Sequence, residues 1–410
     1  MMAPLLFSPL RLRGLTLPNR VVISPMCQHA AEEGCATDWH LVHLGKFALG
    51  GAGLILTEST AVSPEGRIGI ADLGLWADHQ VEPLRRVVRF VHEQGGAIGV
   101  QLAHAGRKAA SAPLWEGGHA LGEAELAARG WRRLGPSAIA AGPAWSRPEA
   151  LDMAGIARVT GDFVAATRRA EAAGFDVLEL HFGHGYLVAS FLSPLSNRRE
   201  DAYGGDREGR MRLALEIAAR VREAWPAAKP LFCRLSAVDG AEGGWGLEDS
   251  VLLARRLKAL GVDVIDVSSG GLTEETRRLA VPRGPGFQCG FAGAIRQGAS
   301  VPTQAVGMIL DGPQAEAVLR DGQADLIAIA REALRDPYWP RHAAEQLGLE
   351  EDYAGWPERH GVWLAKREQS MGGVLRQRRA ELARAMADTA GADTAGADTA
   401  GAATMGGEQE

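Results

Sequence analysis

Buried strands alternate with helices along most of this chain, and the alternation limits the possible fold more than any other feature. Short apolar runs such as AGLILTES at 52–59 and DLIAIA at 325–330 are typical of strands. Segments with helical spacing lie between them, for example 81–93 and 153–173. The predicted strands begin at Val21, Ala52, Ala97, Phe175, Leu231, Val262, Val301 and Asp325. Eight strands with intervening helices predict an α/β fold, a (β/α)8 TIM barrel.

Three segments depart from this alternation. Residues 107–148 are rich in Gly, Ala, Pro and Trp without a sustained period, so we expect a cap inserted between strands three and four. The barrel should span 1–342, followed by a partly helical extension at 343–386. Ala-Asp-Thr-Ala-Gly then occurs three times within 387–401, and we expect 387–410 to be a low-complexity, disordered tail.

Composition narrows the class of function. The 410 residues carry a net charge of -6 with basic and acidic residues interspersed, which does not indicate a nucleic-acid surface. No apolar run is long enough to span a bilayer, and the start, MMAPLLFSPLRLRG, has no signal-peptide pattern. Four cysteines in so long a chain do not form a disulfide framework. We therefore expect a cytoplasmic protein that acts on a small molecule.

The segment FDVLELHFGHGY places three polar side chains at the end of the fourth strand. They are His181, His184 and Tyr186. Each histidine could be a satisfied polar residue at a strand end, or the two could bind a metal. No third ligand stands at a short spacing, although catalytic zinc sites usually have one. A third interpretation is a pair of donors that binds a carbonyl oxygen, with Tyr186 placed to move a proton.

Other candidates lie at the same end of the predicted barrel. Cys27 follows the first strand, where it could be inert packing or part of a site. Arg234 lies inside the apolar strand LFCRLS and needs a partner, either in a structural ion pair or as a cation facing an anionic ligand. The loops after strands seven and eight carry Gly307, Gly312 and Arg331, in the place where such barrels commonly bind phosphate.

Taken together, these motifs resemble the Old Yellow Enzyme family of FMN-dependent ene-reductases, in particular its bacterial xenobiotic-reductase branch. The resemblance covers roughly residues 6–338. It is carried by Ser24-Pro-Met-Cys27, Gln101, His181-x-x-His184-x-Tyr186, Ser193-Pro194, Asn197-Arg-Arg199, Tyr203-Gly-Gly205, Arg234, Gly307 and Arg331.

The resemblance implies a role for each matching residue. The positions that hold the isoalloxazine of FMN match Ser24, Pro25, Met26, Cys27, Ser59, Gln101 and Arg234. Those at the phosphate match Gly307, Ala330 and Arg331. Cys27 matches a cysteine that tunes the flavin potential and touches substrate, His181 and His184 the pair that binds the substrate carbonyl oxygen, and Tyr186 the proton donor. His29 stands where the family often has tyrosine, so we expect it to contact substrate.

These matches predict an FMN-dependent ene-reductase that consumes NADPH or NADH and forms a homo-oligomer, a dimer or tetramer. One alternative is a reductase of an unsaturated or aromatic acyl-CoA thioester. A second is a metal-dependent hydrolase on the same fold, and a third is a barrel that only binds a phosphate-bearing ligand. The iron–sulfur branch of the superfamily needs clustered cysteines after the barrel, and no cysteine follows Cys289.

Overall fold

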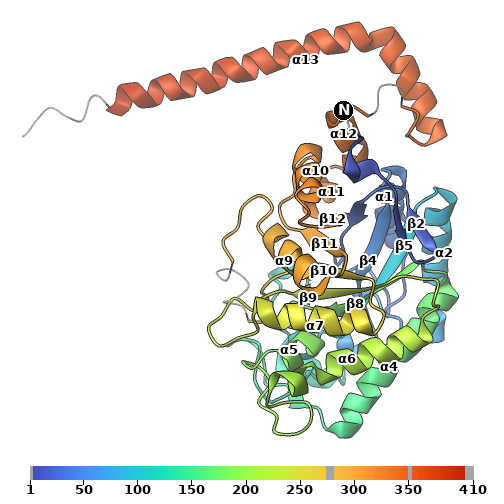
Figure 1. Ribbon diagram of the computed structural model, residues 1–410, viewed down its shortest axis with the longest axis vertical. Helices are drawn as coiled ribbons and strands as arrows, with labels where there is room; N and C mark the ends of the chain where they lie inside the picture. The colour runs from blue at the N-terminus through green and yellow to red at the C-terminus, as the bar shows by residue number, and fades with distance from the viewer. Residues whose placement is uncertain (1–2, 274–280, 350–352, 402–410) are drawn as a thin grey trace, which may run out of the picture. The chain divides into compact units, whose positions relative to one another are not determined.

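The computed structural model describes residues 3–273, 281–349 and 353–401. The chain divides into two compact units, residues 1–349 and 350–410. In the first unit, eight parallel strands close a barrel, as the sequence predicts (Figure 1). In ring order they are β3 (Val21–Ile23), β4 (Leu54–Ala61), β5 (Ala97–Ala103), β8 (Val177–Phe182), β9 (Leu231–Ser236), β10 (Val264–Ser268), β11 (Thr303–Val306) and β12 (Leu326–Ile329).

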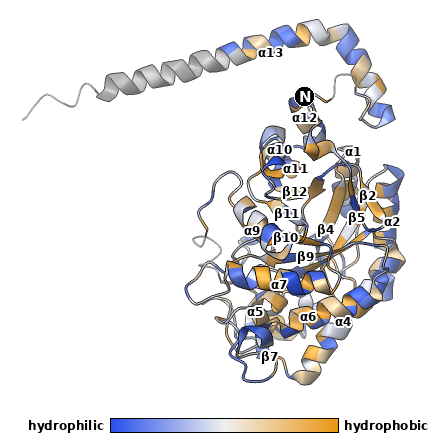
Figure 2. Ribbon diagram, viewed as in Figure 1, coloured by the Kyte–Doolittle hydropathy of each residue, from blue (hydrophilic) through white to orange (hydrophobic). Residues whose placement is uncertain are grey.

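Helices follow the strands and cover the outside of the barrel. They are α1 (Asp38–Leu49), α2 (Val81–Glu93), α4 (Met153–Ala173), α6 (Arg207–Ala224), α7 (Leu247–Ala259), α9 (Cys289–Ala299) and α10 (Gly312–Arg320). Shorter helices are α5 (Leu187–Leu192), α11 (Arg331–Arg335) and α12 (Trp339–Gln346). Each long helix buries one face, as α2 does with Leu84, Val87, Val88 and Val91. Apolar strands and two-faced helices are visible in Figure 2.

Successive residues of a strand point to opposite sides of the barrel wall, and this alternation separates two environments. On β8, Leu178 and Leu180 join the large core beneath the helices, whereas Val177 joins a smaller cluster with Phe232 and Val264. The alternation therefore turns Val177 and then Glu179 and His181 toward the barrel interior. The interior is apolar at the N-terminal ends of the strands and polar at their C-terminal ends.

A β-hairpin closes the N-terminal end of the barrel. β1 (Leu10–Leu12) and β2 (Leu15–Leu17) pair antiparallel. Leu12 and Leu17 belong to the same buried cluster as the interior residues at the starts of the strands. The hairpin thus fills the bottom of the barrel with apolar side chains.

The segment between β5 and β8 has a small core of its own. It contains α3 (Glu123–Ala128) and the paired strands β6 (Leu134–Gly135) and β7 (Glu149–Ala150). Its buried apolar side chains are Ala110, Ala112, Leu121, Leu126 and Trp131. Arg107, buried at its start, donates to the carbonyl oxygens of Ile139, Ala140 and Leu272, which ties the segment to the loop after β10. Its role as a cap remains a prediction.

The second unit contains the helix α13 (Glu358–Gly401). The bounds of α13 include the repeats at 387–401, and the disorder expected for 387–410 stays a prediction. Residues 402–410 lie outside the described residues. Within the described ranges, no helix combines the length and apolar character needed to cross a membrane.

The packing of α4 against the barrel predicts the stability of two variants on that helix. Phe163 is fully buried, whereas Met153 is 55% exposed. Phe163→Ala should lower the free energy of unfolding by about 3–5 kcal/mol, because it removes buried apolar surface and leaves a cavity. Met153→Ala, the matched control, should change it by less than about 1 kcal/mol. Urea denaturation monitored by circular dichroism measures both; equal effects would contradict this packing.

Candidate active site

A cavity of about 440 Å³ opens at the C-terminal ends of the barrel strands. From the barrel, its lining includes Cys27, His29, His184, Tyr186, Ser268 and Arg331. From the segment between β5 and β8, it includes Lys108, Leu114 and Trp145. The structure therefore brings five of the predicted site residues to one cavity from three separate strand ends. The segment expected to be a cap contributes part of the wall.

His181 and His184 form a contacting pair at the end of β8. His184 Nδ1 lies 3.1 Å from His181 Nε2, and the rings are nearly perpendicular at 84°. The backbone N–H of Gly183 donates to His181 Nδ1 (3.2 Å). The Tyr186 ring lies 5.0 Å from the His181 ring. Two imidazoles and a phenol are thus gathered at one point beside the cavity.

The backbone at His184 adopts a conformation that non-glycine residues rarely use, with φ +58°. Its N–H donates to Ser236 Oγ (2.9 Å), and its carbonyl oxygen accepts from Lys108 Nζ (2.8 Å). Gly185 follows at φ +70°, where an added Cβ would lie 2.5 Å from the Gly271 carbonyl oxygen. These contacts hold the strained turn that directs the His184 ring back toward His181.

Both histidines are neutral at physiological pH. Burial lowers the pKa of His181 well below its ordinary value, and the neighbouring His184, Arg234 and Lys108 lower it further. Burial, followed by Arg234 and Lys108, lowers the pKa of His184 in the same way. A neutral imidazole has one N–H donor and one acceptor nitrogen, so the arrangement of their protons matters.

Beneath the pair, a layer of charged side chains crosses the barrel interior. The strand ladder sets His181 beside Arg234 and Arg234 beside Asp266. Arg234 Nε lies 3.2 Å from Asp266 Oδ2, and its Nη1 donates to Ser24 Oγ (3.2 Å). On the next strand pair, Gln101 Nε2 donates to Glu179 Oε1 (2.8 Å). Arg234 therefore has the structural ion pair that its buried position requires, and it also reaches the end of β3.

Two carboxylates share this single guanidinium. Burial, and next the Asp266 carboxylate, raise the pKa of Glu179 to about 8, against its ordinary 4.5. Burial also raises the pKa of Asp266, while Arg234 opposes that rise. At neutral pH we therefore assign the negative charge to Asp266 and a proton to Glu179. The layer is then electrically balanced.

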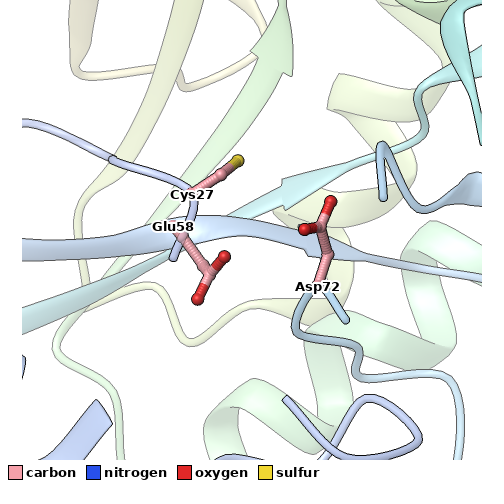
Figure 3. A group of neighbouring side chains, drawn as sticks. All are labelled: Cys27, Glu58 and Asp72. Atoms are coloured by element: carbon pink, nitrogen blue, oxygen red, sulfur yellow. The ribbon is translucent and has the colours of Figure 1, made fainter. Parts of the chain in front are cut away.

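Cys27 lies beside two buried carboxylates, Glu58 at β4 and Asp72 in the loop that follows it (Figure 3). Burial first, and then Asp72 and Glu58, raise the pKa of the Cys27 thiol well above its ordinary value. The residue is consequently a neutral thiol in the cavity wall. It lacks the electropositive surroundings that activate a cysteine as a nucleophile.

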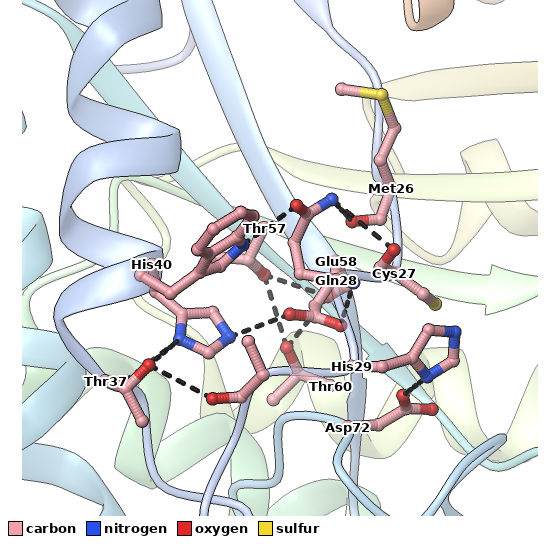
Figure 4. A network of polar contacts seen from close by, with 12 residues as sticks. Met26, Cys27, Gln28, His29, Thr37, His40, Thr57, Glu58, Thr60 and Asp72 are labelled. Atoms are coloured by element: carbon pink, nitrogen blue, oxygen red, sulfur yellow. Dashed lines mark hydrogen bonds and ion pairs between the residues drawn. The ribbon is translucent and has the colours of Figure 1, made fainter. Parts of the chain in front are cut away.

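Hydrogen bonds fix both carboxylates (Figure 4). Glu58 contacts His40 Nε2 (2.9 Å) and accepts the Gln28 backbone N–H (2.9 Å). Asp72 pairs with His29, 2.7 Å from its Nδ1. The hydrogen bond from His29 to Asp72 raises the pKa of His29, although burial opposes the rise. His29 therefore brings positive charge to the cavity wall.

The far end of the cavity has features suited to an anion. Arg331, the first residue of α11, lines the wall there. Gly307 follows β11 at φ +126°, a backbone conformation that L side chains rarely adopt. An added Cβ at Gly307 would come within 2.9 Å of Phe287 and Gln288. Phe287 and Gln288 thus leave no room for a side chain at Gly307, and the Arg331 guanidinium is the group here that suits a phosphate.

The remaining predicted residues do not line the cavity. Ser59 pairs with Gln101 in the strand ladder, Pro25 and Met26 precede Cys27, and Ala330 precedes Arg331. Sequence reasoning did not single out Lys108, Glu179, Ser268 or Asp266. Polar residues at alternate positions of VLELHF and VIDVS were the available signal for Glu179 and Asp266, because alternate residues share a face.

Comparison with known proteins decides the family. The family model of NADH:flavin oxidoreductases and NADH oxidases matches residues 5–350. The chain belongs to this family. It is 45% identical over 349 residues to the NADPH dehydrogenase of Geobacillus sp. (strain WCH70), covering 85% of this chain and 96% of that protein. The resemblance to Old Yellow Enzymes is thereby confirmed, and the protein is an FMN-containing NAD(P)H:flavin oxidoreductase.

Solved structures agree with this assignment. Morphinone reductase in complex with tetrahydroNAD superposes with a TM-score of 0.69 at 29% identity, covering 85% of this chain and 92% of that one. A 2-naphthoyl-CoA reductase complex superposes with a TM-score of 0.75 at 23% identity, covering 85% of this chain and 53% of that one. The second likeness concerns the fold alone.

The residues around the cavity fit FMN. A volume of about 440 Å³ is within the range of cofactor sites. Arg331, which lines the cavity, suits the phosphate. In the barrel interior, the Arg234 guanidinium and the Gln101 amide are donors that suit a ring rich in carbonyl and nitrogen acceptors. We accordingly expect these residues to hold the two ends of the cofactor.

The shared charge of the interior layer predicts a pH-dependent stability. Between pH 4.5 and about 8, Glu179 is ionised in the unfolded chain but protonated in the folded one. Its stabilising contribution is therefore complete below pH 4.5 and is lost as the pH rises to about 8. Glu179→Gln keeps an acceptor for Gln101 and removes the titration. Its melting temperature relative to wild type should be higher at pH 8 than at pH 5; an equal difference at both would contradict the assignment.

The carboxylates beside Cys27 predict how its thiol reacts. Asp72→Asn removes one of the negative charges that raise the thiol pKa, so alkylation of Cys27 by iodoacetamide should have a lower pH midpoint than in wild type. Peptide mass spectrometry can follow each cysteine separately. Cys35, whose pKa is raised by burial, Glu33 and Glu32, serves as the internal control and should not change. An unshifted Cys27 midpoint would contradict the electrostatic role of Asp72.

Proposed function

We propose that this protein is an ene-reductase, which transfers a hydride from reduced FMN to the β-carbon of an activated alkene such as an enone. The observation that carries the proposal is the His181–His184 pair. The two imidazoles are neutral and lie beside the cavity, with His184 Nδ1 3.1 Å from His181 Nε2. The centre of the Tyr186 ring lies 5.0 Å from that of His181. A carbonyl oxygen between the ring nitrogens would accept hydrogen bonds from both sides.

The proposal gives each side chain one task. N–H groups of His181 and His184 hold the carbonyl oxygen and stabilise the negative charge that develops on it. Tyr186 gives its hydroxyl proton to the α-carbon. Lys108 Nζ lies 5.1 Å from the centre of the Tyr186 ring, where its charge favours the phenolate left behind. FMN, when bound, supplies the hydride.

Two further residues have supporting tasks. Arg234 holds the acceptor-rich end of the cofactor and favours negative charge there. His29, paired with Asp72, places positive charge in the cavity wall and donates a hydrogen bond to an acceptor group of the substrate. The proposed substrate is therefore a small molecule with one carbonyl conjugated to the alkene, and a further acceptor group would improve its binding.

The alternatives receive less support. Reduction of an acyl-CoA thioester is suggested by the likeness to 2-naphthoyl-CoA reductase, but at 23% identity that likeness extends to the fold alone. A metal-dependent hydrolase would use both histidines as ligands. Among the described residues, the group of three potential ligands close enough for one ion is Cys27, Glu58 and Asp72, and it includes neither histidine.

A visible absorption spectrum tests the proposal directly. Purified protein should show flavin bands that bleach on anaerobic addition of NADPH and return on addition of 2-cyclohexenone. Return with the enone but not with cyclohexanone would support alkene reduction. Bands that bleach and never return with any enone would overturn the proposed substrate class, while leaving the family unaffected.

The role given to Tyr186 predicts a selective defect. Tyr186→Phe should slow reoxidation by 2-cyclohexenone about 100-fold, because the variant has no hydroxyl proton to transfer. Bleaching by NADPH and FMN content should remain as in wild type. Stopped-flow absorbance separates the two half-reactions. Tyr203→Phe makes the same chemical change at a residue whose hydroxyl donates to Glu216, outside the cavity lining, and should slow neither half-reaction.

A further inference from the structure

The hydrogen bonds around the histidine pair run in one direction. Because the Gly183 N–H donates to His181 Nδ1, the proton of neutral His181 is on Nε2. That N–H donates to His184 Nδ1 at 3.1 Å, so the proton of His184 is on Nε2 and donates to Ser268 Oγ at 2.8 Å. The Ser268 hydroxyl in turn donates to Gln288 Oε1 at 3.2 Å.

This arrangement is unsuited to the proposed reaction. A carbonyl oxygen between the two rings needs two N–H donors, yet His184 presents an acceptor nitrogen on that side. For His184 to donate from Nδ1, its Nε2 must lose the proton and become an acceptor. Ser268 is the partner that faces Nε2, and it is 5% exposed, so within the described structure the buried nitrogen depends on this hydroxyl.

The surroundings of Ser268 permit the reversal. A serine hydroxyl can rotate and either accept from His184 Nε2–H or donate to a bare Nε2. When it turns away from Gln288, Gln288 Oε1 keeps the hydrogen bond from Ser269 Oγ at 2.7 Å. The number of protons is unchanged: one leaves His184 Nε2 and one arrives at Nδ1, exchanged with water in the open cavity.

We propose that Ser268 is a positioning residue that selects the tautomer of His184, its hydroxyl turning from Gln288 to His184 when a carbonyl oxygen binds between the imidazoles. This inference rests on the proposed function. Without the Ser268 hydroxyl, the donating tautomer of His184 leaves Nε2 buried without a donor, so Ser268→Ala opposes the form of the pair that binds substrate.

Ser268→Ala should weaken cyclohexanone binding and raise the KM for 2-cyclohexenone about tenfold, the effect of one buried hydrogen bond. Ser268→Thr retains the hydroxyl and should restore both values. Ser63→Ala is the matched control, because Ser63 is also buried, lies outside the cavity lining and has a hydroxyl without a hydrogen-bond partner in the described structure; it should stay within about twofold of wild type. FMN content, measured by absorbance, shows that each variant is folded and loaded.

Nuclear magnetic resonance reads the tautomer itself. In oxidised holoprotein with ¹⁵N-labelled histidine, cyclohexanone should convert His184 from the Nε2–H to the Nδ1–H form in wild type and Ser268→Thr, and much less in Ser268→Ala. If cyclohexanone binds wild type without that conversion, or if Ser268→Ala matches Ser63→Ala, the role of Ser268 is overturned and the proposed function stands. If wild type neither binds the ketone nor reduces the enone, both are overturned.

Discussion

The charged layer inside the barrel is the constraint on which the site depends. A guanidinium in a closed barrel is tolerable only beside an anion, and the Arg234–Asp266 pair satisfies this condition across one step of the strand ladder. A second buried acid, Glu179, must then hold a proton, because one cation cannot neutralise two carboxylates. The histidines above the layer have lowered pKa values chiefly because they are buried, and the nearby Arg234 guanidinium adds to this effect.

The same rule of alternating strand faces explains why polar and apolar residues can share one short strand. In β8, apolar side chains seal the barrel against its helices while Glu179 and His181 occupy the interior. The loops beyond the strands then add groups that the strands cannot supply. His184 reaches back through a left-handed turn, and Lys108 arrives from the segment between β5 and β8. Strands therefore determine the electrostatics of the site, and loops determine its geometry.

Much of this could be predicted from sequence, since period and residue type carry the information. Eight apolar runs predicted the barrel, and the residues at their ends predicted the cavity wall. Helix α9 escaped prediction because it contains three glycines, and packing outweighs their poor helix propensity: Gly298 lies against Val251, where a Cβ would approach to 2.6 Å. The roles of Ser268 and Lys108 were not predicted, because they depend on contacts across the barrel that no local sequence pattern indicates.

The hairpin at the bottom of the barrel has a consequence for the order of events above it. Because Leu12 and Leu17 fill the N-terminal end, the cavity at the C-terminal end is the side from which ligands approach. The nicotinamide that delivers a hydride and the molecule that later receives it therefore approach from the same end of the barrel. Between the departure of the first ligand and the arrival of the second, the enzyme holds the pair of electrons that the first ligand delivered.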